Sequence, residues 1–272
     1  MRILGYRNTS ILNGAGATPA PEIFTYTEAG GNATITGCIA ACPSFVRIPS
    51  TIDGFTVTAI ADLAFYNESL TGLTLPNAIA DIGASAFKDN LLTSIILPSS
   101  LITLQSLSFD NNDLTSVIIG DSVTIIGSYS FNNNALTSAT IGDSVTIIGN
   151  SAFWGNDLTS VTIPSSVTSI EGGAFFGNDL TSVTIPEGIT ILNSRVFQGN
   201  DLTSVTIPSS VTSISTFAFQ SNLLVTIAFD GDRPTLALNS FAHNGTLATI
   251  TYINGKVGWP GDSIAGIAPT AV

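Results

Sequence analysis

The chain has few charged or chemically reactive side chains. Of its 272 residues, 10% are charged, and it contains one histidine, two cysteines and one methionine. The histidine, His243, stands beside Asn244, and no serine lies in a Gly-x-Ser-x-Gly elbow. Neither a pair of carboxylates nor a phosphate-binding glycine loop stands out. We therefore expect a protein that is not an enzyme and that uses no cofactor.

Basic residues are especially scarce. Nineteen acidic residues stand against seven basic ones, which gives a net charge of −12. The basic residues lie singly along the chain, at Arg2, Arg7, Arg47, Lys88, Arg195, Arg233 and Lys256. Without a basic stripe, the chain cannot neutralise many phosphates or dock on an anionic membrane surface. Nucleic acid and lipid are therefore not expected as partners, and the acidity is interpreted as a solubility feature.

A long apolar segment is also missing. Residues 1–10 lack the continuous apolar run of about 7–15 residues that a signal peptide needs. Residues 122–142 carry no charge, but Gly, Asn, Ser and Thr occur throughout them, so we expect no membrane insertion. Hydrophobic residues still make up 44% of the chain, and Thr, Ser, Asn and Gly dominate the rest. This composition is typical of extracellular, β-rich proteins, so we expect an extracellular or cell-surface location, although no signal peptide is visible.

What the sequence does contain is a repeat with a period of 22 residues. The segment LTSVTIPSSVTSIEGGAFFGND at 158–179 returns in similar form at 180–201 and again from residue 202. One column of the repeat is Leu70, Leu92, Leu114, Leu136, Leu158, Leu180, Leu202 and Leu224. Another is Phe65, Phe87, Phe109, Phe131, Phe153, Phe175, Phe197, Phe219 and Phe241. A fixed period of this length is the signature of a solenoid.

The pattern inside one repeat predicts the course of one coil. In 158–163 the apolar residues alternate as in a short strand, with Thr162 outward, and Pro164 ends the strand because it lacks an N–H donor. A second extended run covers 167–170, and a tight helical or 3₁₀ turn is expected at Phe175. A single coil buries too little apolar surface to offset the entropy of ordering it. We therefore expect coils that share a core and are joined by continuous strand hydrogen bonds.

The repeat divides the chain into four parts. Residues 1–22 read as a leader or linker, and 23–47 as an N-terminal cap with a hairpin at Gly30-Gly31. The solenoid covers 48–252, and 253–272 form a C-terminal cap and tail in which Trp259 is expected to cover the final coil.

Cys38 and Cys42 lie four residues apart in the expected N-terminal cap. Extracellular cysteines at this spacing can close a small loop, but the sequence does not show whether their Cβ atoms face each other. A disulfide and two buried thiols are therefore both open. A metal site is less expected, because no histidine and no further cysteine lies nearby.

The pattern Leu-x-x-Val-x-Ile-Pro, then Val-Thr-x-Ile-Gly, then Ala-Phe and Asn resembles the BspA-type (Treponema-type) leucine-rich repeats. The resemblance covers about residues 43–252, and IPSTIDGFTVTAIADLAF at 48–65 is similar to the family's first repeat. It implies a leucine-rich repeat solenoid that is mainly β, right-handed and curved. A parallel sheet would line the concave face, with short strands and 3₁₀ or helical turns opposite. It also implies a bacterial or protist surface or secreted protein, in several members an adhesin.

The outward position of each first strand is the candidate ligand-binding site, on the expected concave face. It is occupied by Thr74, Ile96, Ile118, Thr140, Thr162, Thr184 and Thr206. Adjacent coils lie ~4.8 Å apart, so the hydroxyls would form a polar strip with an apolar spot at Ile96 and Ile118. Alternatively, threonine only suits a half-exposed strand and bonds its neighbours. An ice-binding array is disfavoured by the two isoleucines and by curvature.

Two further columns lie at the turns. Asparagine follows each phenylalanine by three residues, at Asn90, Asn112, Asn134, Asn156, Asn178, Asn200, Asn222 and Asn244. Asparagine tolerates left-handed turns and its amide can bond the turn backbone, so this column is interpreted as structural. Asp157, Asp179 and Asp201 stack three carboxylates at coil spacing. Their repulsion in water is about 1 kcal/mol per close pair, so no metal is needed, and calcium is a minor alternative.

The sequence therefore predicts a non-enzymatic, adhesin-like binding module. It would recognise an extracellular protein or a glycan through the strand face. The rival hypothesis is a structural module that assembles with itself through homotypic contacts, in a filament or a cell-surface coat. Concentration-dependent assembly would favour the rival hypothesis, and a monomer that retains a ligand would favour adhesion.

Overall fold

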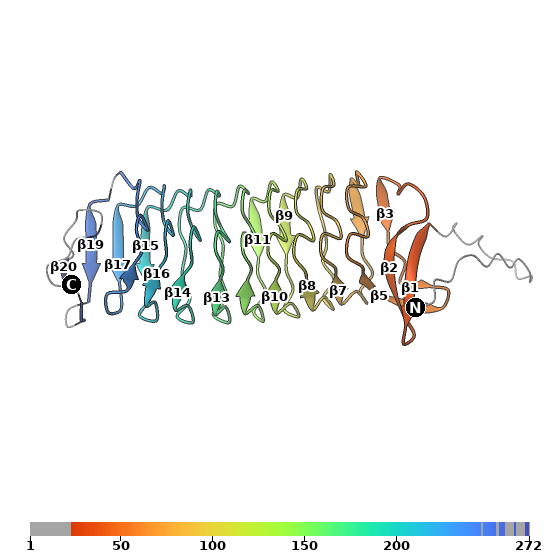
Figure 1. The fold of residues 1–272 in the computed structure, drawn as a ribbon, viewed down its shortest axis with the longest axis horizontal. Helices are drawn as coiled ribbons and strands as arrows, with labels where there is room; N and C mark the ends of the chain where they lie inside the picture. Colours follow the sequence, from red (N-terminus) through yellow and green to blue (C-terminus); the bar gives the residue numbers. More distant parts are fainter. Residues whose placement is uncertain (1–22, 246, 254–255, 259–263, 265–269, 272) are drawn as a thin grey trace, which may run out of the picture.

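The computed structural model describes residues 23–245, 247–253, 256–258, 264 and 270–271. It is a single row of stacked coils, with β1 near one end and β20 (Thr270–Ala271) at the other (Figure 1). No α-helix occurs among these residues. The leucine-rich repeat solenoid expected from the sequence is thus confirmed. The expected leader at 1–22 and the expected position of Trp259 lie outside the described residues.

Each coil contributes up to two short strands, and both series are parallel. The first series contains β3 (Phe45–Arg47), β6 (Gly72–Thr74), β9 (Ser116–Ile118), β11 (Ser138–Thr140), β15 (Ser204–Ile207), β17 (Thr226–Phe229) and β19 (Thr249–Tyr252). The second contains β5 (Phe55–Ile60), β7 (Asp81–Ile82), β8 (Thr103–Leu104), β10 (Ile125–Ile126), β12 (Ile147–Ile148), β13 (Ser169–Ile170), β14 (Ile191–Leu192), β16 (Ser213–Ile214) and β18 (Thr235–Leu236). In the second series neighbouring strands pair at the repeat register, for example Ile125 with Ile147, except that β13 and β14 belong to separate sheets.

The repeated phenylalanines form one continuous stack in the core. Neighbouring rings in the column lie near parallel, with centroids 5.2–5.8 Å apart. The repeated leucines from Leu70 to Leu224 are fully buried beside them. Phe24 meets Phe65 edge-on at 6.2 Å and so ends the stack on the N-terminal side. Offset or edge-on aromatic pairs add about 0.5–1.5 kcal/mol each beyond the area they bury, so the column is a main source of cohesion between coils.

The turns around this column carry a continuous backbone ladder, and we call these turns the turn edge. The N–H groups of Ser151, Phe153 and Gly155 donate to carbonyl oxygens 21 residues later, each at 2.9 Å. The same three bonds recur in every coil from 63–67 to 195–199. Within a coil, Ala152 N–H donates to Gly149 and Trp154 N–H to Ser151, so the expected helical turn is instead two consecutive β-turns.

The ladder of first strands is less continuous than the sequence predicts. Residues 92–97, 158–163 and 180–185 are not paired as strands, although Leu158 and Ile163 are buried as expected. The expected continuous strand hydrogen bonds are therefore missing in these coils. The turn edge and the shared core hold the coils together there, and single backbone bonds such as Thr181 N–H to the Thr159 carbonyl at 3.2 Å remain between the first-strand segments.

The N-terminal segment forms the predicted hairpin. β1 (Phe24–Ala29) pairs antiparallel with β2 (Asn32–Cys38), and Gly30 and Gly31 both have positive φ, as a tight hairpin turn requires. β2 then pairs parallel with β5, and the short β4 (Thr51–Ile52) pairs with the other side of β5. The hairpin thereby continues the second-strand series and covers the first coil.

Cys38 and Cys42 form a disulfide, which decides between the two alternatives that the sequence leaves open. Because the closed loop is short, we expect the bond to contribute about 2 kcal/mol to the free energy of unfolding. Urea denaturation of the wild type with and without a thiol reductant should show this difference. The variant with Cys38→Ala and Cys42→Ala should match the reduced protein and should not respond to reductant. Equal stability of oxidised and reduced wild type would contradict the expectation.

Candidate functional site

The predicted ligand-binding residues do share one surface, which we call the strand face: the exposed side of the first strands and of the matching segments. Ile118 aligns with Thr140, and Thr206 aligns with Ala228 and then Thr251. Thr74 is half-buried, and the other candidates are exposed, namely Ile96, Ile118, Thr140, Thr162, Thr184 and Thr206. The column therefore faces outward over the length of the solenoid.

The candidate threonines have free hydroxyl groups. The side chains of Thr74, Thr140, Thr162, Thr184 and Thr206 make no hydrogen bond with any described residue. Threonines elsewhere in the coil behave differently: Thr146 Oγ1, for example, donates to the Thr124 carbonyl of the preceding coil at 3.1 Å. The neighbour bonds expected in the alternative interpretation are therefore not made by these threonines, and the preference of threonine for a half-exposed strand stays as an alternative.

Three exposed apolar side chains lie in the N-terminal half of the strand face, and we call this group the Ile–Phe patch: Phe45, Ile96 and Ile118. Ile96 is 87% exposed and Ile118 is 69% exposed, and Phe45 is exposed as well. The Phe45 ring lies across Gly72, where a Cβ atom would overlap the ring, and it also faces the Arg47 guanidinium at 6.0 Å. These side chains add nothing to the core, so the patch is available to a partner.

The asparagine column is structural, and its amides bond the turn backbone as predicted, but the asparagines do not take the left-handed conformation. Asn178 is buried, its Nδ2 donates to the carbonyls of Phe153 at 2.9 Å and Phe175 at 3.3 Å, and its Oδ1 accepts from Leu158 N–H at 3.1 Å. Each such amide links its own coil to the preceding one. The left-handed conformation falls instead on the residue before it, as in Gly177 with φ 63°.

The carboxylate column lies on the surface of the turns. Asp157, Asp179 and Asp201 are exposed. Among the residues that the structure describes, no three His, Cys, Asp or Glu side chains come together as metal ligands would. His243 lies in the exposed turn position expected for it, with φ 58°, and its Nδ1 is 3.1 Å from Gln220 Nε2.

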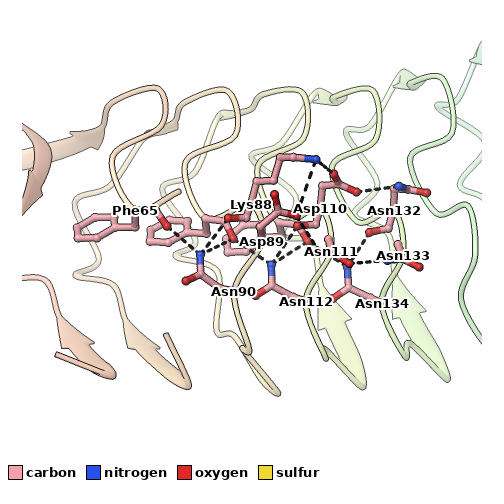
Figure 2. Close-up of polar contacts among 12 residues, drawn as sticks. Phe65, Lys88, Asp89, Asn90, Asp110, Asn111, Asn112, Asn132, Asn133 and Asn134 are labelled. Carbon is pink, nitrogen blue, oxygen red and sulfur yellow. Dashed lines mark hydrogen bonds and ion pairs between the residues drawn. The ribbon is translucent and has the colours of Figure 1, made fainter. Parts of the chain in front are cut away.

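One polar cluster was missed by the sequence reasoning, and it lies on the outer side of the turn edge (Figure 2). Lys88 forms an ion pair with Asp110, whose other oxygen accepts from Asn132 at 2.7 Å. In the next column Asn111 donates to Asp89 at 2.8 Å. Burial acts to lower the pKa of Lys88, but the hydrogen bond and charge of Asp110, with Asp89, outweigh it and raise that pKa. The ion pair could have been predicted from the spacing of 22 residues between Lys88 and Asp110, because this spacing places them at the same position of adjacent coils.

No helix in the described ranges combines the length and the apolar character needed to traverse a bilayer.

The repeats match the BspA-type leucine-rich repeat region at residues 58–178 and 146–257, in six copies. The chain belongs to the BspA-type leucine-rich repeat family. This family is a repeat scaffold of the binding-module kind. No curated protein matches the chain.

Two solved bacterial structures show the same fold as this BspA-type protein. A leucine-rich repeat protein from Bacteroides ovatus is 19% identical, with a TM-score of 0.63, over 88% of this chain and 71% of that one. The pneumococcal vaccine antigen PcpA is 19% identical, with a TM-score of 0.64, over 88% of this chain and 70% of that one. At this identity the likeness establishes the fold alone.

Proposed function

We propose that this BspA-type protein is a non-enzymatic, adhesin-like binding module, displayed on a cell surface or secreted. One observation carries the proposal: a rigidly stacked scaffold presents free threonine hydroxyls and exposed isoleucines in one outward column of the strand face. Solenoids commonly use such extended faces to bind a partner. The disulfide, the polar composition and the likeness to a vaccine antigen support an extracellular location.

A protein ligand fits the strand face better than a glycan does. The Ile–Phe patch combines two exposed isoleucines with an aromatic ring that faces the Arg47 guanidinium. Apolar and aromatic anchors with a neighbouring arginine are typical of protein interfaces, and the threonine strip beyond them would provide the polar rim. Burial of the patch against a partner would remove its apolar surface from water.

The test compares matched pairs of exposed isoleucines. We expect the double variant Ile96→Asp, Ile118→Asp to bind the ligand of the wild type more than about tenfold more weakly. In the complex, two carboxylates would then be buried where the wild type buries apolar side chains. The control is Ile102→Asp with Ile125→Asp, which changes exposed isoleucines outside the strand face. Binding of the purified chain to matrix proteins, glycans and intact cells would be measured after sizing by light scattering.

A second variant tests the rest of the face. Thr162→Glu, Thr184→Glu and Thr206→Glu add charge to exposed positions and should leave the fold intact. Equal binding by both strand-face variants and by the wild type would contradict the proposed site. Assembly that grows with protein concentration, without any retained ligand, would instead support the self-assembling module.

A further inference from the structure

The outer side of the turn edge carries polar side chains in most coils and aromatic side chains in two consecutive coils. One column consists of the residues that directly follow each buried phenylalanine. From the N-terminal side it reads Tyr66, Lys88, Asp110, Asn132, Trp154, Phe176, Gln198, Gln220 and Ala242. The polar members bond one another from coil to coil, as Lys88 does with Asp110 and Gln198 with Gln220. Two consecutive aromatic residues interrupt these polar pairs.

These aromatic residues form an exposed shelf with a third ring. Trp154 stacks on Phe176, with centroids 5.4 Å apart and planes 22° apart, and Tyr129 lies 6.5 Å from Trp154. Trp154 is 39% exposed, and Phe176 and Tyr129 are half-buried. The buried phenylalanine stack already supplies the core at this level. The shelf is therefore an outer layer of aromatic surface rather than part of the core.

Glycine keeps the shelf uncovered. The next column carries side chains in most coils, including Asp89, Asn111 and Asn133, all in left-handed conformation. In the coils of Trp154 and Phe176, and in the coil that follows them, it holds Gly155, Gly177 and Gly199, with φ between 63° and 66°.

A side chain at these glycines would lie against the rings. A Cβ atom at Gly177 would contact Trp154 Cδ1 at 3.8 Å, and one at Gly199 would contact Phe176 Cε2 at 3.5 Å. Asparagine occupies the same backbone conformation in other coils, so the turn itself does not require glycine at these positions.

A polar hollow adjoins the shelf. Its volume is ≈ 400 Å³, and its lining consists of the polar side chains of Lys88, Asp89, Asp110, Asn111, Asn132 and Asn133, together with Trp154 and Gly155. Figure 2 shows the carboxylates and amides of the polar side in adjoining rows, one coil after another. The hollow thus places amide donors and carboxylate and amide acceptors next to an exposed indole ring.

We propose that this hollow and the aromatic shelf together form a binding site for an uncharged carbohydrate chain. The apolar C–H face of a sugar ring can pack on the indole and phenyl rings, which removes apolar surface from water. Its hydroxyl groups both donate and accept hydrogen bonds, so they can bond the Asn amides, which do both, and the Asp carboxylates, which accept. The repeated coils offer similar groups at regular intervals, which suits a chain of similar sugar units.

The charges of the hollow disfavour an ionic ligand. Its one cation, Lys88, is paired with Asp110 and lies 4.0 Å from Asp89, so it offers little to an anion. Asp89 also accepts a hydrogen bond from Asn111, which uses part of its acceptor capacity and leaves the rest for a neutral donor. Neutral polar groups therefore dominate what the hollow presents to a ligand.

The test uses the full chain and isothermal titration with four β-linked tetrasaccharides, those of glucose, N-acetylglucosamine, mannose and galactose. We expect at least one to bind with a Kd below ~1 mM. Because the ligand is neutral, binding should persist in about 0.5 M salt, and the anionic polysaccharide heparin should not compete.

Gly177→Asn is the decisive variant. It removes no contact and introduces a residue that Asn111 and Asn133 show to be compatible with this turn, but its side chain would cover the Trp154 ring. We expect it to weaken saccharide binding at least about tenfold, as Trp154→Ala should, with an unchanged thermal unfolding midpoint for Gly177→Asn.

The strand-face variant Thr162→Glu, Thr184→Glu, Thr206→Glu is the control and should bind the saccharide like the wild type. If no tetrasaccharide binds below ~1 mM, or if Gly177→Asn binds as well as the wild type, the proposal is wrong. Loss of saccharide binding in the strand-face variant alone would move the sugar site to the strand face. That result would overturn this inference and leave the proposed binding function intact.

Discussion

Phe175→Ala is expected to lower the free energy of unfolding by about 3–5 kcal/mol, the largest loss of any single change considered for this protein. Phe175 is fully buried and stacks on Phe153 at 5.5 Å and on Phe197 at 5.7 Å. Its removal leaves a cavity between two rigid coils and breaks the stack in its middle. Urea denaturation followed by circular dichroism measures the loss.

Alanine variants of two other phenylalanines serve as comparisons for this loss of stability. Phe241 occupies the same repeat position near the end of the stack, with a stacked partner at Phe219, so Phe241→Ala should cost less. Phe45 is exposed on the strand face, and Phe45→Ala should change stability by no more than about 0.5 kcal/mol. A loss at Phe175 no larger than the one at Phe45 would mean that the phenylalanine stack does not hold the coils together.

Asn178→Ala is expected to cost about 2–4 kcal/mol, the second largest effect. The change leaves the Leu158 N–H and the Phe153 carbonyl without the amide that now bonds both, and the site is too buried for water to replace it freely. Asn178→Asp should be at least as harmful, because a carboxylate cannot donate to the Phe153 and Phe175 carbonyls and would be buried beside them.

The neighbouring Asp179 provides the matched control. Its side chain is exposed, and only its backbone N–H is used, to bond the Leu158 carbonyl at 3.0 Å. Asp179→Ala should therefore leave the free energy of unfolding within about 0.5 kcal/mol of the wild type. Equal effects of Asn178→Ala and Asp179→Ala would show that the buried amide ladder contributes nothing specific.

The sequence predicts the core of this fold well, because burial depends on repeat position. Every repeated leucine and phenylalanine from Phe65 to Leu224 is fully buried. The sequence does not predict which first strands pair. LTSVTI occurs identically at 158–163, 180–185 and 202–207, but only the last of these segments contains a strand, β15. Pairing depends on how closely the neighbouring coil approaches, and a local sequence does not hold that information.

Some features of the turn edge could be predicted from the sequence, and others could not. The residue before each asparagine is Asp89, Asn111, Asn133, Gly155, Gly177, Gly199, Ser221 or His243. This column is rich in residues that tolerate left-handed backbone, so the sequence did contain the signal that distinguishes it from the asparagine column. The hollow beside Trp154 was not predictable in the same way, because it depends on side-chain conformations across several coils.

The central claim is that the turn edge, rather than the strand face, holds the coils together and leaves the strand face free for a partner. Backbone hydrogen exchange, followed residue by residue with NMR, tests it most directly. The account predicts strong protection of the Leu158 and Phe153 amides, which bond to the next coil, and fast exchange at Val161 and Val183. Slow exchange at Val161 and Val183, with fast exchange at Leu158 and Phe153, would contradict the account.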